Sequence, residues 1–467
     1  MSFWNRRKSV DMADSLSATH RLKPTLSWPH LVALGVGAIV GTGIYTLTGI
    51  GAGIAGPAVI LSFALAGGVC ACAALAYAEL ATMMPVAGSA YTYSYAVIGE
   101  LIAWIVGWSL ILEYTVVCAA VAVGWSAYAA GVIHSLHLGI SDTLLAGPQA
   151  GGIVNLPAIL ISLVVAGLLV LGTRESATLN FALVVIKLVA LGAFVFLALP
   201  AFDTAHFTPF APNGMFKLTA EGTKLGIVPA ASLIFFAFYG FDTISTAAEE
   251  TKNPGRDLSI GIVGSMILCT LIYMIVAAAA IGAAPSEKLA RSAEPLAFIL
   301  RELSHPVAAN LIGIAAIVAL PSVIMAFLYG QSRIFFVMAR DGLLPRALSR
   351  VSQRTGTPVL MTVLTGIWAA AISGFAPLKA IAELANAGTL CAFVAVAACM
   401  MILRLREPQR ARVFRTPLWW LVGSLAVAGC LYLFVNLPGK TQLFFFGWNA
   451  IGLAVYFLYS MRASRLA

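Results

Sequence analysis

The sequence is poor in charged residues. Only 10% of its 467 residues are Asp, Glu, Lys or Arg, whereas 60% are hydrophobic. Soluble domains carry about 25% charged residues, so this composition excludes an ordinary aqueous fold and indicates that lipid solvates much of the chain. Length alone would allow about three soluble domains, but the composition favours a single bundle with many membrane spans.

Paired cysteines and paired metal ligands are also missing. All seven cysteines lie in apolar runs and none forms a C-x-x-C motif, which argues against disulfides and a zinc site. His134 and His137 fall in an expected solvated loop, and the apolar runs contain no H-E-x-x-H motif of the kind that membrane-embedded metalloenzymes use. We therefore predict that the protein is not an enzyme and needs no metal and no cofactor.

Acidic residues are outnumbered, and the net charge is +9. The basic residues occur in short clusters between apolar runs and do not form one patch. This distribution is typical of cytoplasmic loops that face anionic lipid. It argues against nucleic-acid binding and makes membrane lipids the expected surroundings.

The apolar runs predict twelve membrane spans, since a spanning helix needs about 20 mostly apolar residues. The third and eighth runs are long, so we expect these helices to be tilted or to extend past the lipid. The twelve runs are 31–55, 57–83, 91–125, 153–172, 178–199, 228–249, 258–283, 307–338, 357–374, 379–403, 418–436 and 442–461.

The distribution of Lys and Arg among the loops predicts the orientation. Twenty of the 28 basic residues fall in the two tails and in alternate loops, and seven fall in the remaining loops. Positively charged loops stay in the cytoplasm, so we expect a multi-pass protein of the cytoplasmic (inner) membrane with both termini cytoplasmic. The largest outside segments, 200–227 and 284–306, each have room for a short surface helix.

Four ionisable residues fall inside or at the edge of the apolar runs: Glu79, Glu113, Lys187 and Asp242. Such residues are rare in hydrocarbon and are usually functional. Glu79 is close to the inner end of the second span, where a structural and a functional role are equally open. For Lys187 and Glu113 the alternatives are buried ion pairs that lock the bundle, or a substrate and proton pathway.

Glycines interrupt the first span, where GVGAIVGTGIYTLTG occupies residues 35–49. Each glycine inside a helix costs about 1 kcal/mol relative to alanine. The G-x-G-x-x-x-G spacing and the lack of a preceding strand exclude a dinucleotide-binding motif. One explanation is close helix packing through the GxxxG of Gly37 and Gly41. The other is that the helix is broken here for a purpose.

The sixth span favours the second explanation. FFAFYGFDT also interrupts an apolar helix, at Gly240 and Asp242. Spans one and six begin two five-span halves, and paired interruptions at such positions indicate an inverted-repeat transporter. Main-chain groups freed at a break are tolerated only where they line a cavity or meet a ligand. A half-helix N-terminus suits a carboxylate and bare carbonyls suit an ammonium, so the pattern predicts an α-amino acid.

Four motifs resemble those of a known family: GVGAIVGTGIYTLTG, YAELATMMPVAGSAYTYSY, FFAFYGFDTISTAAEETKNPGRDLSIGI and YGQSRIFFVMARDGLLP. With them the chain resembles the amino acid–polyamine–organocation superfamily, and more narrowly bacterial members of the cationic amino acid transporter family. The resemblance implies an all-α integral membrane protein with a LeuT-like fold. That fold has two inverted repeats of five spans, with discontinuous first and sixth helices, and here two further C-terminal helices.

On this scheme the chain divides into four parts. Residues 1–30 form the cytoplasmic N-terminal tail and 31–199 the first repeat. Residues 228–403 form the second repeat, and 404–467 the last two spans with the cytoplasmic C-terminus.

The resemblance also implies a substrate site at the two breaks. The amides of Thr42 and Gly43 would meet the substrate carboxylate, and the carbonyls of Ile39, Phe236 and Tyr239 would meet its α-amine. The Phe236 ring matches an aromatic gate over the substrate. The expected substrate-binding residues here are Ile39, Thr42, Gly43, Phe236, Ala237 and Tyr239.

Four further residues are implied around that site. Glu113 and Asp242 match acidic positions beside it. Lys187 matches a fifth-span lysine that stands in for a sodium ion, so its proton, with Asp242, would provide coupling to protons. Met325 is a candidate pocket wall that would obstruct a long cationic side chain, or else it only packs in the core or against lipid.

We therefore predict a proton-coupled symporter that carries L-amino acids by alternating access. The alternatives are an amino acid/amine exchanger and a transporter-like amino acid receptor. The expected partners are an L-amino acid, protons and lipids, and the sequence leaves open a small accessory membrane subunit.

Overall fold

The computed structural model describes residues 6–8, 26–85, 88–137, 139–171, 177–246, 248, 251–345, 348 and 359–464, and only the backbone of 177–180, Thr246 and Arg333. Residues 1–5 and 9–25 of the expected N-terminal tail lie outside the described residues. Most of the described chain is helical. The principal helices are α2 (Trp28–Ile39), α3 (Thr48–Ala55), α4 (Val59–Met83), α5 (Ser89–Val97), α6 (Glu100–Ser135), α7 (Leu156–Val170), α8 (Ala177–Ala198), α9 (Ile227–Ile234), α10 (Phe241–Thr246), α11 (Pro254–Ala283), α12 (Ser286–Ala290), α13 (Pro295–Glu302), α14 (Pro306–Arg340), α15 (Val359–Phe375), α16 (Leu378–Arg406), α17 (Trp419–Asn436), α18 (Gly439–Val455) and α19 (Met461–Ala463).

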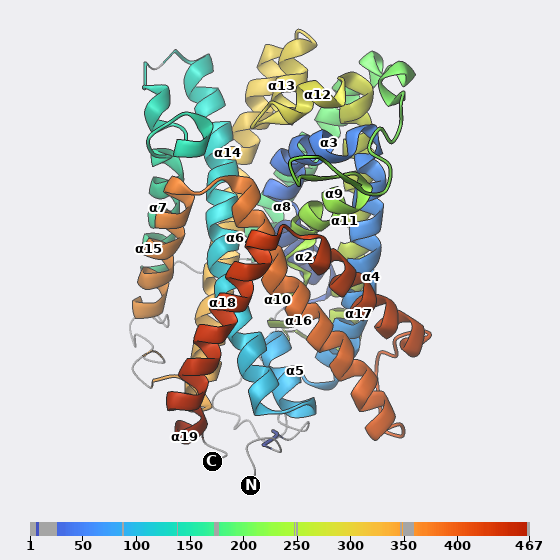
Figure 1. Cartoon of the computed structure of the whole chain (residues 1–467), viewed down its shortest axis with the longest axis vertical. Coiled ribbons are helices and arrows are strands. Elements are labelled where there is room, and N and C mark those ends of the chain that lie inside the picture. The colour runs from blue at the N-terminus through green and yellow to red at the C-terminus, as the bar shows by residue number, and fades with distance from the viewer. Residues whose placement is uncertain are drawn as a thin grey trace.

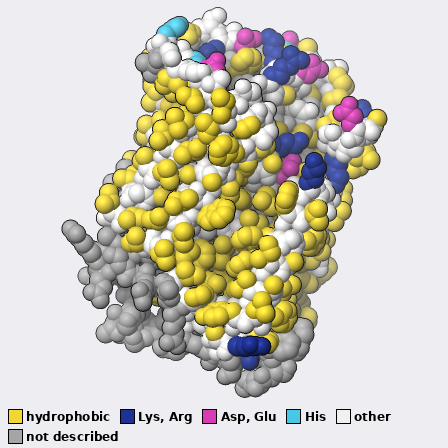
Figure 2. Space-filling model, turned by 60° about the vertical axis from the view of Figure 1, so that its left-hand side comes forward, with side chains coloured by type: hydrophobic (Ala, Val, Ile, Leu, Met, Phe, Trp, Pro, Cys, Tyr) yellow, Lys and Arg dark blue, Asp and Glu magenta, His cyan; other side chains and the backbone are white. Residues whose placement is uncertain are grey.

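The long helices form one bundle in which most run between the same two ends (Figure 1). Among the described residues, nine helical segments are long and apolar enough to cross a membrane, and α7 and α15 are apolar but shorter. Hydrophobic side chains cover most of the lateral face in Figure 2, and Leu171, Phe196 and Leu458 are among the most exposed. The chain is an all-α membrane protein whose outer surface suits lipid.

The first and the sixth predicted spans are both interrupted. α2 ends at Ile39, Val40 leaves the helical conformation with ψ of 92°, and a π-helix, η3 (Gly43–Leu47), leads into α3. In the sixth predicted span, α9 is followed by a 3-10 helix, η9 (Phe235–Phe238), and then by Gly240 with φ of +113° before α10 begins. Residues with a Cβ atom rarely adopt that φ, so Gly240 permits the change of direction.

The start of the third predicted span differs from expectation. Residues 91–125 were predicted to form one helix, whereas the structure has a separate buried helix α5 and a longer helix α6 from Glu100 to Ser135. Gly99 lies between them with φ of +141°, a conformation that glycine accepts readily. The apolar composition runs on across this joint, so the turn was hidden in the hydropathy pattern.

The two large segments outside the predicted spans are built differently from each other. Segment 284–306 contains the short helices α12 and α13, as expected. Segment 200–227 contains a two-stranded antiparallel hairpin of β1 (Lys217–Leu218) and β2 (Lys224–Leu225) together with two 3-10 turns. His134, expected in a loop, instead lies in the last turn of α6, and its ring lies 2.7 Å from the Asp142 carboxylate, with both side chains exposed.

A buried ion network closes the end of the bundle that carries both tails. The Glu79 carboxylate, 1% exposed, accepts two hydrogen bonds from Arg404, at 2.7 and 2.8 Å, and one from Arg412 at 3.1 Å. The backbone amide of Thr416 donates a fourth at 2.8 Å. Glu79 thus ties α4 to α16 and to the segment that follows it, and these contacts assign it a structural role.

The first described residues, 6–8, meet the C-terminal segment at this same face. Arg6 donates to the carbonyl of Met461 at 2.8 Å and to the Glu100 carboxylate at 3.4 Å. Tyr456 and Ser464 also donate to Glu100, at 3.0 and 2.6 Å. One buried carboxylate therefore joins the N-terminal segment, α6 and the C-terminal segment.

A tryptophan contact ties the last long helix to the longest one. The Trp108 indole N–H donates to the carbonyl of Trp448, and the Trp448 indole donates back to the carbonyl of Trp108, both at 2.9 Å. The two rings stack with centroids 4.9 Å apart. Trp104 adds a bond of 2.8 Å to the carbonyl of Gly452. Three hydrogen bonds from indole groups to backbone carbonyls therefore hold α18 against α6.

We predict that Glu79→Gln destabilises the protein strongly, because it leaves Arg404 and Arg412 without their shared counter-charge. Removing one partner of a buried ion pair costs about 3–5 kcal/mol. The melting temperature of the detergent-purified protein measures the effect. Glu302→Gln is the matched control: its pair with Lys288 is exposed, so a loss of about 0–1 kcal/mol is expected. Equal melting temperatures for the two variants would contradict the structural role of Glu79.

Candidate functional site

The two helix interruptions contact each other. A Cβ atom on Gly43 would lie 2.3 Å from the Cα of Ala237, and one on Gly240 would lie 2.7 Å from the carbonyl carbon of Ala38. Neither position can hold a side chain without displacing the other helix. By contrast, a Cβ on Gly41 would make only an ordinary contact, at 3.5 Å, with Val323. The glycines at 43 and 240 therefore permit α2, η3, η9 and α10 to meet at one point.

Tyr273 of α11 joins the two interruptions through their carbonyl groups. Its hydroxyl lies 2.7 Å from the carbonyl oxygen of Ile39 and 3.0 Å from that of Ala237. A hydroxyl carries one proton, so it donates to these two acceptors in turn or shares between them. Sequence reasoning missed Tyr273, because a lone tyrosine in an apolar run has no local signal of this role.

Asn386 of α16 satisfies the end of α9. Its amide nitrogen donates to the carbonyls of Ser232 and Leu233, at 2.6 and 3.1 Å. Its amide oxygen accepts a hydrogen bond from the hydroxyl of Tyr239. The last carbonyls of a helix have no intrahelical partner, so Asn386 stabilises the interruption. It too was missed by sequence reasoning.

Lys187 lies fully buried beside the first interruption. Its ammonium donates to the carbonyl of Gly37 at 2.7 Å and to the Ser322 hydroxyl at 3.3 Å. The backbone carbonyl of Lys187 accepts a bond of 3.4 Å from Tyr45. Lys187 thus connects α8 with α2 and α14.

The acidic residues lie at the second interruption. Asp242 is in the first turn of α10 and accepts a hydrogen bond of 2.7 Å from Tyr114. Glu113 precedes Tyr114 on α6 and packs against Gly388 of α16, where a Cβ would meet its own at 3.0 Å. The oxygen Oε2 of Glu113 is buried and has no hydrogen-bond partner among the described residues.

The structure does not bring Glu113 next to Thr42. The Thr42 side chain points at Gly124 of α6, where a Cβ would lie 2.2 Å from its methyl group. Gly124 is eleven residues beyond Glu113, about 16 Å along a helix. The Thr42 hydroxyl is buried and, within the described chain, unpartnered. The hydroxyl of Thr42, which contacts α6 at Gly124, and the carboxylate of Glu113, which belongs to α6, therefore lie at different levels of that helix.

The remaining predicted site residues are positioned as follows. Phe236 is 5% exposed, and its ring centroid lies 5.1 Å from that of Tyr239. Met325 is half-buried on α14, three residues beyond Ser322, the hydroxyl partner of Lys187. Phe236 thus belongs to the interruption itself, whereas Met325 lies on the helix that faces Lys187.

A short helical cap covers α3 at the end opposite the tails. Cβ atoms on Gly49 and Gly53 would lie within 2.6 Å of the carbonyl of Leu289 and 2.8 Å of the Cβ of Ala290, both on α12. Glu294 pairs with Arg301 of α13. Burial raises the pKa of the Glu294 carboxyl, and Arg301 opposes that rise. The cap is therefore packed closely onto the first broken helix.

A family model described as amino acid permease matches residues 26–460. The chain belongs to the amino acid permease family. The resemblance to the amino acid–polyamine–organocation superfamily and its cationic amino acid transporters is thereby confirmed. The protein is a permease and not an enzyme, as predicted.

Several curated relatives match the permease over most of its length. The branched-chain amino acid permease BcaP of Bacillus subtilis (strain 168) is 40% identical over 466 residues, covering 99% of this chain and 98% of that one. The methylthioribose transporter of the same organism is 38% identical over 469 residues, covering 100% of each. The vacuolar cationic amino acid transporter 2 of Arabidopsis thaliana is 39% identical, covering 86% of this permease and 63% of that protein.

We predict that Gly43→Ala disrupts the contact between the two interruptions, whereas Gly41→Ala is tolerated. The first substitution forces a methyl group into the backbone of Ala237, and the second meets only the side chain of Val323. Overpacking of this kind typically costs about 1–3 kcal/mol. The melting temperatures of the two purified variants test the prediction. Indistinguishable values would show that the approach at Gly43 is not tight.

Proposed function

We propose that this permease is a proton-coupled symporter of L-amino acids that works by alternating access across the cytoplasmic membrane. The observation that carries the proposal is the meeting of two interrupted helices at Gly43 and Ala237. In a bilayer, irregular main chain is tolerated only where it is buried in protein or lines a cavity. Substrate sites of transporters occupy such discontinuities.

The two interruptions offer complementary groups to a zwitterion. The backbone amides of Thr42 and Gly43 lie at the N-terminus of η3. They favour a carboxylate, since helix N-termini carry partial positive charge. The carbonyls of Ile39, Phe236 and Tyr239 favour an ammonium. Tyr273 uses one lone pair of the Ile39 carbonyl, and a second lone pair remains for the substrate.

Lys187 would carry the coupling proton, with Asp242 as a second acidic group at the other interruption. The charged form of Lys187 holds α2 through the carbonyl of Gly37, and a charge-assisted bond is about twice as strong as a neutral one. Loss of the proton weakens that bond. The protonation state of Lys187 would therefore bias how firmly α2 is held against α8 and α14.

We further propose a LeuT-like arrangement of five plus five inverted spans and two C-terminal ones, with the division at 31–199, 228–403 and 404–467. Each of the twelve predicted runs overlaps a helix of the structure, which supports this count. Arg6 bonds to Met461 near the C-terminus, and Arg404, Arg406 and Arg412 reach the same face. By the positive-inside rule that face is cytoplasmic.

The substrate class follows from the charges at the interruptions. The names of relatives point to branched-chain amino acids, cationic amino acids and methylthioribose. Opposed main-chain dipoles favour a ligand with adjacent carboxylate and ammonium groups, which methylthioribose lacks. L-Leucine is thus the probe of choice, and competition with a panel of amino acids and methylthioribose would rank the alternatives.

Proteoliposomes distinguish the symporter from the two alternatives. A symporter accumulates L-leucine under an imposed inward proton gradient with nothing but buffer inside. An exchanger requires internal amine or amino acid, and a receptor binds L-leucine without any flux. Uptake that depends on internal counter-substrate would overturn the symport proposal.

We predict that Lys187→Met abolishes gradient-driven accumulation of L-leucine, reducing it to the level of empty vesicles. Methionine fills similar space but holds no proton. Ser322→Ala is the matched control, because it removes one partner and leaves the shorter bond to Gly37. It should retain uptake that depends on the gradient. Full proton-driven accumulation by a folded Lys187→Met protein would refute the role of Lys187.

A further inference from the structure

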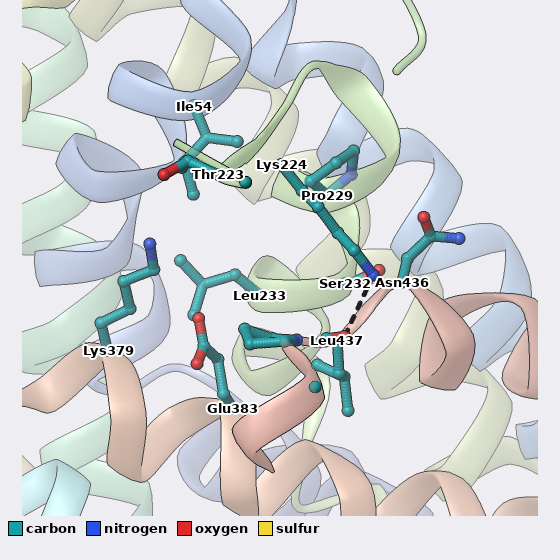
Figure 3. Close-up of a pocket in the computed structure, with 13 residues that line it drawn as sticks. Ile54, Thr223, Lys224, Pro229, Ser232, Leu233, Lys379, Glu383, Asn436 and Leu437 are labelled. Atoms are coloured by element: carbon teal, nitrogen blue, oxygen red, sulfur yellow. Dashed lines mark hydrogen bonds between the residues drawn. The ribbon is translucent and has the colours of Figure 1, made fainter. Parts of the chain in front are cut away.

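A cavity lies beside α9, just before the second interruption, and at the N-terminal end of α16 (Figure 3). Its volume is about 280 Å³, and its walls come from β2, α9, α16 and the connection between α17 and α18. Ligand pockets usually measure about 300–1,000 Å³. This cavity is therefore of a size for one small metabolite with a few waters.

Two opposite charges line the cavity without pairing. Lys379 and Glu383 both rise from α16, one turn apart (Figure 3). Among the described residues, neither forms an ion pair within 4.0 Å. A lysine four residues before a glutamate is also the less favourable order for a direct helical pair. Both groups are thus free to meet a third.

Glu383 is a buried carboxylate with few hydrogen-bond partners. It is only 7% exposed, and the one hydrogen bond that the described chain supplies comes from Thr441, at 3.4 Å. A buried carboxylate is costly unless it is paired or well hydrogen-bonded. Its carboxylate therefore has unused capacity to accept hydrogen bonds from a cation inside the cavity.

The third charged residue of the cavity, Lys224, is already hydrogen-bonded to the protein. Its ammonium donates to the carbonyls of Val435 and Leu437, at 3.1 and 3.2 Å, and Figure 3 shows the side chain extended across the cavity toward Leu437. It closes a wall by joining the hairpin to the connection between α17 and α18. Lys379 and Glu383 therefore remain the charged pair available to a ligand.

We propose that this cavity is a second binding site of the permease, for a small zwitterion such as a free amino acid. The carboxylate of the ligand pairs with Lys379 and its ammonium with Glu383. The choice of ligand class rests on the proposed function. The site differs from the one proposed at the interruptions, since none of the substrate-binding or proton-coupling residues named above lines this cavity.

The second site acts on the broken helix through Asn386. Ser232 and Leu233 of α9 line the cavity, and their carbonyls accept hydrogen bonds from Asn386, three residues beyond Glu383 on α16. Asn386 also accepts from Tyr239 at the interruption. A ligand that bridges Lys379 and Glu383 stiffens this part of α16 and so holds α9 in its present position.

The test counts bound L-leucine on the full-length purified protein by equilibrium binding. Wild type should bind two molecules per chain at saturation. Gly439→Trp should bind one, because a Cβ on Gly439 meets nothing within 4 Å and the indole fills the cavity that Gly439 lines. Gly447→Trp, on the same helix but exposed and equally unobstructed, is the matched control and should bind two.

Two charge variants test the ligand contacts with little change of shape. Glu383→Gln and Lys379→Met should each lose the second molecule and retain the first, and melting temperatures will show that both variants fold. Isocaproate and isoamylamine, which each keep one charged end of L-leucine, should fail to displace the second molecule. Displacement by either compound at the potency of L-leucine overturns the bridging arrangement.

Uptake into proteoliposomes separates this proposal from the proposed function. Wild-type protein that transports L-leucine but binds one molecule, with Gly439→Trp unchanged, overturns the second site and leaves the transport function intact. Protein that neither transports nor binds any amino acid of the panel overturns both. Two bound molecules, one of them lost in Gly439→Trp, Glu383→Gln and Lys379→Met, supports the second site.

Discussion

Main-chain groups that leave a helix inside a bilayer need partners, because hydrocarbon offers none. Side chains supply several of them, among them the hydroxyl of Tyr273 between the two interruptions and the amide of Asn386 at the end of α9. Their helices must therefore lie close to the broken ones. Gly35 of α2 provides the room, since a Cβ there would lie 2.5 Å from the hydroxyl of Ser265 on α11.

The polar groups of the bundle fall into two kinds. Glu79 and Glu100, at the face that carries the chain ends, are saturated with donors. The hydroxyl of Thr42 and one oxygen of Glu113 are buried and lack a partner among the described residues. Buried polar atoms are normally hydrogen-bonded, so these two oxygens keep hydrogen-bonding capacity that Glu79 and Glu100 have already used.

The sequence could predict features that depend on residues within a single helix, namely its position and its interruption. Apolar length located the long helices, and the glycines around residues 35–49 and at Gly240 located the interruptions. The family resemblance singled out Lys187, which in the structure donates to the carbonyl of Gly37.

Contacts between distant segments could not be predicted in this way. Tyr273 and Asn386 are single polar residues whose partners lie on other helices, and no local pattern announces them. The role of Glu79 stayed open because its arginines come 325 and 333 residues later. The turn at Gly99 lies inside an apolar run, so the composition does not show that α5 and α6 are separate helices.

The reciprocal tryptophan hydrogen bonds attach α18, a helix at the surface of the bundle, directly to α6 in its interior. α18 exposes Leu443, Phe444 and Ile451 to the bilayer, whereas α6 carries Tyr114, which holds Asp242. A tilt imposed on α18 by a thinner or thicker membrane would therefore act directly on α6, the helix whose Tyr114 donates to Asp242.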